Sequence, residues 1–190
     1  YKKTRKGNSI IDRIAEDVLK ESSEKFEIID FFPSGSDERQ FCSPGFNLPI
    51  GSLTRTIYNK YSEYHTSGDN LDFVQPKYLQ DTFEKYVMII TKLEEYFGKN
   101  QLIANEEDTD IVSSKNDYQD DKNEENKLVF KNLYPKCEPN LGKRGLYYMI
   151  GGEKDVLNDK MAIFWVLSFS DGKNSLSDIV KRSRIEFKDI

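Results

Sequence analysis

Apolar residues recur at helical spacing in two stretches of the first hundred residues. Ile10, Ile14 and Val18 follow one another at four-residue steps, which predicts a helix over residues 9–20 with one buried stripe. Pro76 suits the first turn of a helix, because its missing N–H needs no partner there. The pattern that follows predicts a helix of about six turns, whose single apolar face we expect in the core: Leu79, Phe83, Val87, Ile90 and Phe97.

Two shorter apolar runs between these helices have the composition of strands. Residues 26–32 combine three phenylalanines with two isoleucines and stop at Pro33, and residues 50–57 form the second run. Helix, strand, loop, strand, loop and helix is the order expected of a layered α/β domain.

A second apolar pattern begins near Leu128 and predicts a small, mostly helical domain. An apolar helix containing Trp165 ends at the polar residues 170–172. Ser175, with Asp178 three residues later, is a capping signature for the next helix. A turn then leads to a third helix that should start near Glu186.

The stretch between these two patterns carries most of the charge. The chain has 190 residues and a net charge of −5, but residues 105–125 alone hold nine acidic and two basic side chains. Such a polar, acidic stretch favours a linker without a fixed fold. We therefore expect domains at residues 1–98 and 128–190, joined by a linker at 99–127, and we assign the acidity to the linker and not to a binding face.

The cysteines and the lengths of the apolar runs bear on the cellular environment of the protein. Cys42 and Cys137 are far apart, which argues against a disulfide framework or a cysteine-based zinc site and favours a reducing, cytoplasmic environment. No run approaches the ~20 apolar residues of a membrane helix. The chain opens at Tyr1 and not at Met, so we expect a piece of a longer protein.

His65 is the only histidine and lies in a polar stretch before the Pro76 helix. Two interpretations are open: a metal ligand, or a hydrogen-bonding group of the loop. A single imidazole cannot hold hydrolytic zinc, because such a site needs about three protein ligands and a water. Asp37 and Glu38 are likewise either a paired acid and base or, as we favour, solvated groups of a turn.

Two motifs together resemble those of a known enzyme family. Residues 35–41 (GSDERQF) and 64–71 (YHTSGDNL) resemble the last third of the di-zinc aminopeptidases that include bacterial leucyl aminopeptidase. Residues 1–97 resemble a branch of that family that is often encoded beside polysaccharide-biosynthesis genes. In that branch a winged-helix domain follows, and residues 133–190 resemble it.

The resemblance implies the C-terminal part of a three-layer αβα aminopeptidase-like domain, followed by a truncated winged helix-turn-helix domain. It implies that His65 is the last zinc ligand, that Asp69 orients the loop, and that Asp37 has a supporting position. Two zinc ions are expected in the full-length protein. The other ligands and the general base would lie upstream, so this chain would hold no catalytic group. Glu38 stands where the family has a histidine.

The resemblance implies a zinc-dependent hydrolase of peptide or amide bonds, with a small peptide or amide as substrate. The alternative is an inactive aminopeptidase-like scaffold whose winged-helix domain docks a partner or nucleic acid. Residues 155–190 contain six basic and six acidic side chains. They lack the basic surface typical of DNA-binding modules, so nucleic acid is the less favoured partner.

Overall fold

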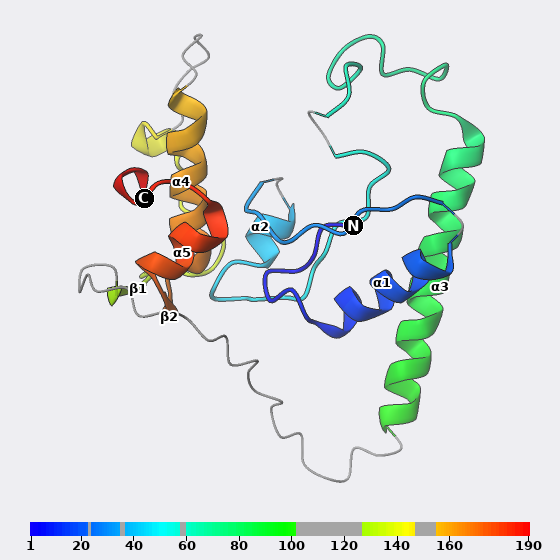
Figure 1. Cartoon of the computed structure of the whole chain (residues 1–190), viewed down its shortest axis with the longest axis horizontal. Helices are drawn as coiled ribbons and strands as arrows, with labels where there is room; N and C mark the ends of the chain where they lie inside the picture. Colours follow the sequence, from blue (N-terminus) through cyan, green and yellow to red (C-terminus); the bar gives the residue numbers. More distant parts are fainter. Residues whose placement is uncertain (23, 35–36, 58–59, 102–126, 147–154) are drawn as a thin grey trace. The chain divides into compact units, whose positions relative to one another are not determined.

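The computed structural model describes residues 1–22, 24–34, 37–57, 60–101, 127–146 and 155–190 (Figure 1). The chain divides into two compact units, and the statements below concern their described residues. The first unit comprises Tyr1–Ile29 and Gly51–Ser114, and the second comprises Asp30–Ile50 and Lys115–Ile190. The contacts thus group residues 30–50 with the C-terminal region. The boundaries 1–98, 99–127 and 128–190 stay a prediction, and most of the expected linker lies outside the described residues.

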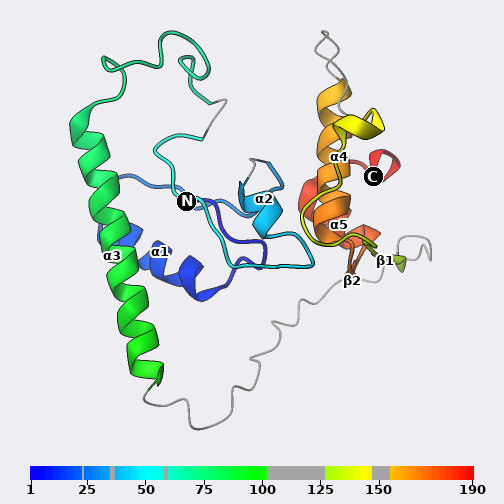
Figure 2. The same cartoon turned by 180° about the vertical axis from the view of Figure 1, so that it is seen from behind.

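Two helices form the body of the first unit, and both were predicted. α1 (Ile10–Glu21) lies across the side of α3 (Pro76–Gln101), as the two opposite views show (Figures 1 and 2). Their shared core consists of buried residues from both helices: Ile14, Ala15, Val18 and Ile89. The four-residue spacing of apolar positions in α1 therefore marks the side that meets α3.

The predicted core face of α3 is exposed, so that prediction is wrong for the described residues. The buried side of α3 carries Lys85 and Ile89, which are 9% and 6% exposed. The exposed fractions of the expected core residues are far higher: Leu79 60%, Phe83 67%, Val87 44%, Ile90 54% and Phe97 53%. The reason is that α3 has apolar residues on two sides, and α1 covers one of them.

Neither predicted strand forms over its full range. Residue 29 pairs in parallel with Lys2, and Ser52 pairs with Lys2 in an antiparallel bridge on the other side. Lys2 N–H donates to the Ser52 carbonyl at 2.9 Å, and Ile29 N–H donates to the Tyr1 carbonyl at 2.9 Å. A strand is only as long as its paired neighbour allows. The three segments therefore make single bridges and no regular sheet.

The second unit combines helices with one pair of short strands. β1 (Val129–Lys131) runs antiparallel to β2 (Asp171–Ser175), with Val129 opposite Ser175 and Lys131 opposite Asp171. The remaining elements are α2 (Asp37–Phe41), η2 (Gly142–Arg144), α4 (Asp155–Phe169), α5 (Leu176–Ser183) and η3 (Phe187–Asp189). The pattern of α4 and α5 was predicted. The expected third helix is one 3₁₀ turn.

The capping signature at Ser175 is confirmed. Asp178 N–H donates to Ser175 Oγ at 3.2 Å, and Ser175 N–H donates to Asp178 Oδ2 at 2.8 Å. These reciprocal bonds satisfy donors that the first turn of α5 leaves without helical partners. α5 ends at Ser183, and the residue that follows it, Arg184, has a left-handed φ of 58°. The two strands of this unit were not predicted, because β2 contains polar residues throughout and lacks the usual strand composition.

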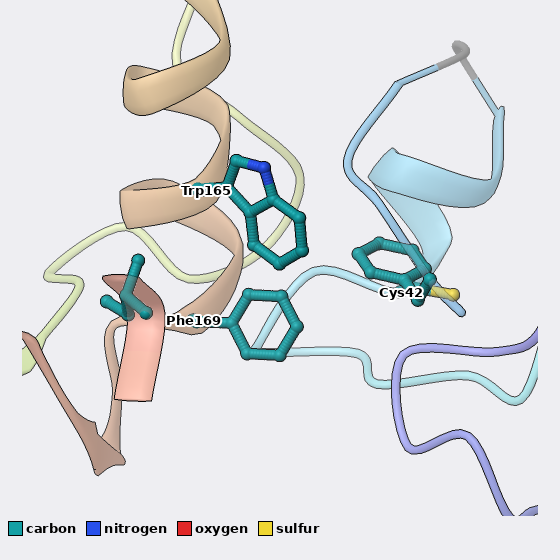
Figure 3. Close-up of a cluster of buried hydrophobic side chains, with 5 residues drawn as sticks. Cys42, Trp165 and Phe169 are labelled. Atoms are coloured by element: carbon teal, nitrogen blue, oxygen red, sulfur yellow. The ribbon is translucent and has the colours of Figure 1, made fainter. Parts of the chain in front are cut away.

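The core of the second unit joins α4 and α5 to residues 30–50. Phe31, Cys42, Trp165, Phe169 and Ile179 form one buried cluster (Figure 3). Trp165 stacks on Phe169 with ring centroids 5.3 Å apart, and Phe31 meets Phe169 edge-on at 6.0 Å. Cys42 is fully buried, and its sulfur lies 3.3 Å from the carbonyl oxygens of Leu48 and Ile50, which share its single hydrogen. Residues 30–50 are therefore part of this core.

Across the described ranges, no helix has the length and apolar character that crossing a membrane would require.

Candidate functional site

The loop that carries His65 is held by a set of local hydrogen bonds. The Glu63 carbonyl accepts from both the backbone N–H and the hydroxyl of Thr66, at 3.0 and 2.8 Å. Thr66 Oγ1 accepts in turn from Gly68 N–H at 3.1 Å, and Asp69 N–H donates to the Thr66 carbonyl at 3.2 Å. Thr66 therefore fixes the backbone on both sides of His65 in the manner of a hydroxyl-bonded turn.

Aromatic rings support the same loop. The His65 imidazole stacks on the Tyr64 ring, with centroids 4.0 Å apart and an interplanar angle of 14°. Tyr64 meets Tyr61 edge-on at 5.6 Å, and Tyr61 stacks on Phe73 at 5.6 Å. Desolvation raises the pKa of the Tyr61 phenol, and the negative charge of Asp69 raises it further. The loop is thus packed through its aromatic rings, although it is rich in polar residues.

His65 is exposed and has a left-handed backbone, with φ of 57°. Non-glycine residues adopt this conformation at a cost, and such residues occur often at functional sites. Asp69, also exposed, lies four residues on in the same loop. The loop therefore presents one imidazole and one carboxylate to the surroundings of the first unit.

Asp37, the third predicted site residue, belongs to the second unit. It is the first residue of α2 and is exposed, whereas Glu38 beside it is half-buried. The structure thus places His65 and Asp69 in one loop and Asp37 on an element of the other unit. The loop brings His65 and Asp69 together within the first unit.

An ion pair joins α2 to the segment that precedes η2. Arg39 Nε lies 2.8 Å from Glu138 Oε2, and Arg39 Nη2 donates to Glu138 Oε1 at 3.0 Å. The two side chains are only 12% and 13% exposed. The Arg39 guanidinium also lies 3.9 Å from the centre of the Phe164 ring on α4. This two-point geometry is the one that arginine and a carboxylate prefer.

Backbone contacts extend this junction along the same two segments. Glu138 N–H donates to the Gln40 side-chain oxygen, and Cys137 N–H donates to Ser43 Oγ, both at 2.9 Å. Gly45 N–H donates to the Pro135 carbonyl at 2.7 Å. Residues 39–45 and residues 135–138 therefore bind one another, which the sequence did not predict.

The described residues can supply part of a metal site. Within the ranges that the structure describes, no three His, Cys, Asp or Glu side chains gather closely enough to hold a metal ion. The donor chemistry of the His65 loop fits one ligand of a zinc ion, since a neutral imidazole is a common zinc ligand and a nearby carboxylate commonly orients it.

Comparison with known proteins gives two family matches. Residues 1–96 match the family described as "Domain of unknown function (DUF4910)", and residues 128–190 match the family described as "winged helix-turn-helix". The second match confirms the predicted winged-helix region. The first covers α1, residues 30–50, the His65 loop and α3 as far as residue 96.

A curated relative and a solved structure extend these matches. The relative, from Clostridium acetobutylicum, is named "Putative polysaccharide biosynthesis protein with aminopeptidase-like domain". It is 43% identical over 190 residues, which are 100% of this chain and 36% of the relative. A crystal structure named as a putative peptidase of the same organism is 39% identical, covers 98% of this chain and 34% of its own, and has a TM-score of 0.47. The chain thus spans about a third of each, and the relative's name agrees with the resemblance inferred from the motifs.

Proposed function

Because this chain belongs to the DUF4910 family and carries a winged helix-turn-helix region, we propose that it forms part of an aminopeptidase-like, zinc-dependent hydrolase of peptide or amide bonds. In this proposal His65 is one metal ligand, Asp69 orients the loop, and Asp37 supports the site from α2. The remaining ligands and the general base belong to the rest of a longer protein, of the size of the matched relative.

The observation that best supports the proposal is that His65 is exposed on a hydrogen-bonded loop. The only imidazole of the chain is exposed, on a left-handed residue of a loop that Thr66 and Tyr64 hold in place. A histidine that served the core would be buried, whereas His65 is exposed and available to a ligand. A metal site that is built from several parts of a protein needs each ligand to be accessible and held in place by its surroundings.

Zinc, when bound, would activate a water and polarise the scissile carbonyl. In this proposal the 190-residue chain supplies one metal ligand, His65, and keeps the loop around it ordered. Since the chain has a single histidine and one imidazole cannot hold hydrolytic zinc, we expect the 190-residue chain alone to show no peptidase turnover.

The test replaces His65 by asparagine in the longer protein. Asparagine tolerates a left-handed backbone, so His65→Asn removes the imidazole with little change to the loop. We expect metal content, measured by elemental analysis, to fall by about one zinc ion per chain. Hydrolysis of an amino-acid p-nitroanilide should fall by more than about 100-fold, because residues that merely support metal ligands already cost 10- to 100-fold.

Ser67→Ala is the matched control, since Ser67 is exposed in the same loop and has no place among the proposed ligands. It should leave zinc content and turnover unchanged. Equal zinc content and equal turnover in wild type and His65→Asn would refute the role of His65. A longer protein that binds no zinc and turns over no substrate would instead support the inactive scaffold.

A further inference from the structure

α2 depends on its neighbours for its position. It has five residues, Asp37–Phe41, and so short a helix gains too little from its own hydrogen bonds to be stable alone. Arg39 follows Asp37 by two positions, which places the two side chains about 200° apart around the helix axis. The Arg39 side chain is accordingly turned into the second unit and only 12% exposed, whereas Asp37 is exposed. Contacts to Arg39 therefore determine where α2 presents Asp37.

The winged-helix region supplies those contacts. Glu138 holds the Arg39 guanidinium at two points, 2.8 and 3.0 Å away, and the centre of the Phe164 ring lies 3.9 Å from the guanidinium carbon. The backbone N–H of Glu138 also donates to the side-chain oxygen of Gln40 at 2.9 Å. Glu138 and Phe164 both lie in the part that matches the winged helix-turn-helix family, residues 128–190. One glutamate thus binds two consecutive residues of α2.

The charge of Glu138 is what keeps Arg39 in this place. Glu138 is itself only 13% exposed, and removing one partner of a largely buried ion pair leaves the other charge without compensation. The Arg39 guanidinium can then recover its hydration only by turning toward water, which displaces α2. Glutamine has nearly the size of glutamate but no charge, so Glu138→Gln isolates the effect of the charge.

We propose that Glu138 is a positioning residue of the aminopeptidase-like site: through Arg39 it fixes α2, and α2 in turn places Asp37. This inference rests on the function proposed above, in which Asp37 supports the metal site. It gives the winged-helix region a direct part in hydrolysis, beyond that of an appended binding module. A partner that separates Glu138 from Arg39 would lower hydrolysis without touching a metal ligand.

The test measures both turnover and the order of α2 in the longer protein, at a temperature at which Trp165 fluorescence shows every variant folded. Glu138→Gln should lower kcat for an amino-acid p-nitroanilide by about 10-fold, the lower end of the effect of groups that support metal ligands, and leave KM and zinc content unchanged. Hydrogen exchange in residues 37–45 should become at least about 10-fold faster, because a charged hydrogen bond that holds the segment is lost. Glu186→Gln is the matched control, since Glu186 lies in the same region and is 74% exposed. It should change neither quantity.

A double variant tests the path through Asp37. Asp37→Asn combined with Glu138→Gln should turn over no more slowly than Asp37→Asn alone, because both changes remove the same contribution. Losses that multiply would overturn the proposal, as would unchanged hydrogen exchange in Glu138→Gln. If glutamine prevents folding, Glu138→Asp gives the same comparison, since it keeps the charge but shortens the side chain that reaches Arg39.

The failure of this inference can be told apart from the failure of the proposed function. An active zinc enzyme whose kcat does not change in Glu138→Gln would overturn the role of Glu138 alone. A longer protein that holds no zinc and turns over no substrate would overturn both.

Discussion

Asp12 is a buried carboxylate that organises the start of the chain. It is 1% exposed, and its two oxygens accept from Tyr1 Oη at 3.0 Å, Thr4 N–H at 2.8 Å, Thr4 Oγ1 at 2.5 Å and Ser9 N–H at 2.9 Å. The bond to Ser9 satisfies the N-terminus of α1, and those to Thr4 fix the segment that leads into the helix. One side chain thus serves as a helix cap and as an anchor for residues 1–9.

Replacing Asp12 by alanine should destabilise the first unit by about 3 kcal/mol, because several buried donors lose their acceptor at once. The matched control is Asp17→Ala, since Asp17 is exposed on the same helix and should cost at most about 0.5 kcal/mol. Urea unfolding followed by circular dichroism measures both. Equal losses for the two variants would show that the Asp12 contacts do not stabilise the unit.

Sequence reasoning reaches residue contacts of this kind only when they are local. The spacing of Ser9 and Asp12 is that of a capping box, so the helix-capping role of Asp12 was available from the sequence. The pairing of Arg39 with Glu138 could not be predicted from the sequence, because they lie 99 positions apart. Either charged residue alone is typical of an exposed surface position. In the candidate site, the motif gave His65 and Asp69, but it carried no sign of the stacking of His65 on Tyr64.

Gly45 marks a close approach of two segments of the second unit. A Cβ atom at Gly45 would lie 2.9 Å from the Pro135 carbonyl carbon and 3.0 Å from the Lys136 nitrogen. Both are backbone atoms, so they cannot move aside as a flexible side chain would. The glycine therefore allows the segment after α2 to reach residues 135–138.

Gly45→Ala should accordingly destabilise the second unit by about 1 to 3 kcal/mol, the usual range for overpacking. Gly98→Ala is the control: Gly98 lies in α3 with nothing within 4 Å of its added Cβ, and the change should stabilise that helix by up to about 1 kcal/mol. Thermal unfolding of the two variants should therefore shift in opposite directions. A neutral Gly45→Ala would mean that residues 135–138 do not pack on this segment.

At the level of elements, helices were predictable because their evidence lies within the element. The periodic apolar positions of α1, α3 and α5 are local, and so is the cap of α5. Strands depend on a partner elsewhere in the chain. Residues 26–32 look like a strand and make one bridge, whereas the polar residues of β2 form a strand because β1 lies beside them. The side of α3 that would be buried also depended on its neighbours.

The family matches and the packing of side chains divide the chain at different places. Phe31 and Cys42 fall within the family match at residues 1–96, yet their side chains share a core with Trp165 and Phe169 of the winged-helix region. The winged-helix region therefore takes part of its core from the DUF4910 region. This arrangement also explains why the three predicted site residues divide between the units, since Asp37 lies in the segment that packs with α4 and α5.

The single tryptophan makes this division measurable, because Trp165 lies in the core of the second unit. Phe31→Ala removes a ring that meets Phe169 edge-on and should cost about 3 to 5 kcal/mol, which shifts the urea midpoint of Trp165 fluorescence to lower concentration. Ile14→Ala removes a side chain of similar burial from the first unit, at a comparable cost of about 2 to 5 kcal/mol. This variant should leave the Trp165 fluorescence midpoint unchanged and lower the midpoint measured by circular dichroism.

Both residues lie within residues 1–96, so position in the sequence predicts the same response to both. Equal shifts of the Trp165 midpoint would show that the two units unfold as one body, and no shift with Phe31→Ala would show that residues 30–50 contribute nothing to the winged-helix core.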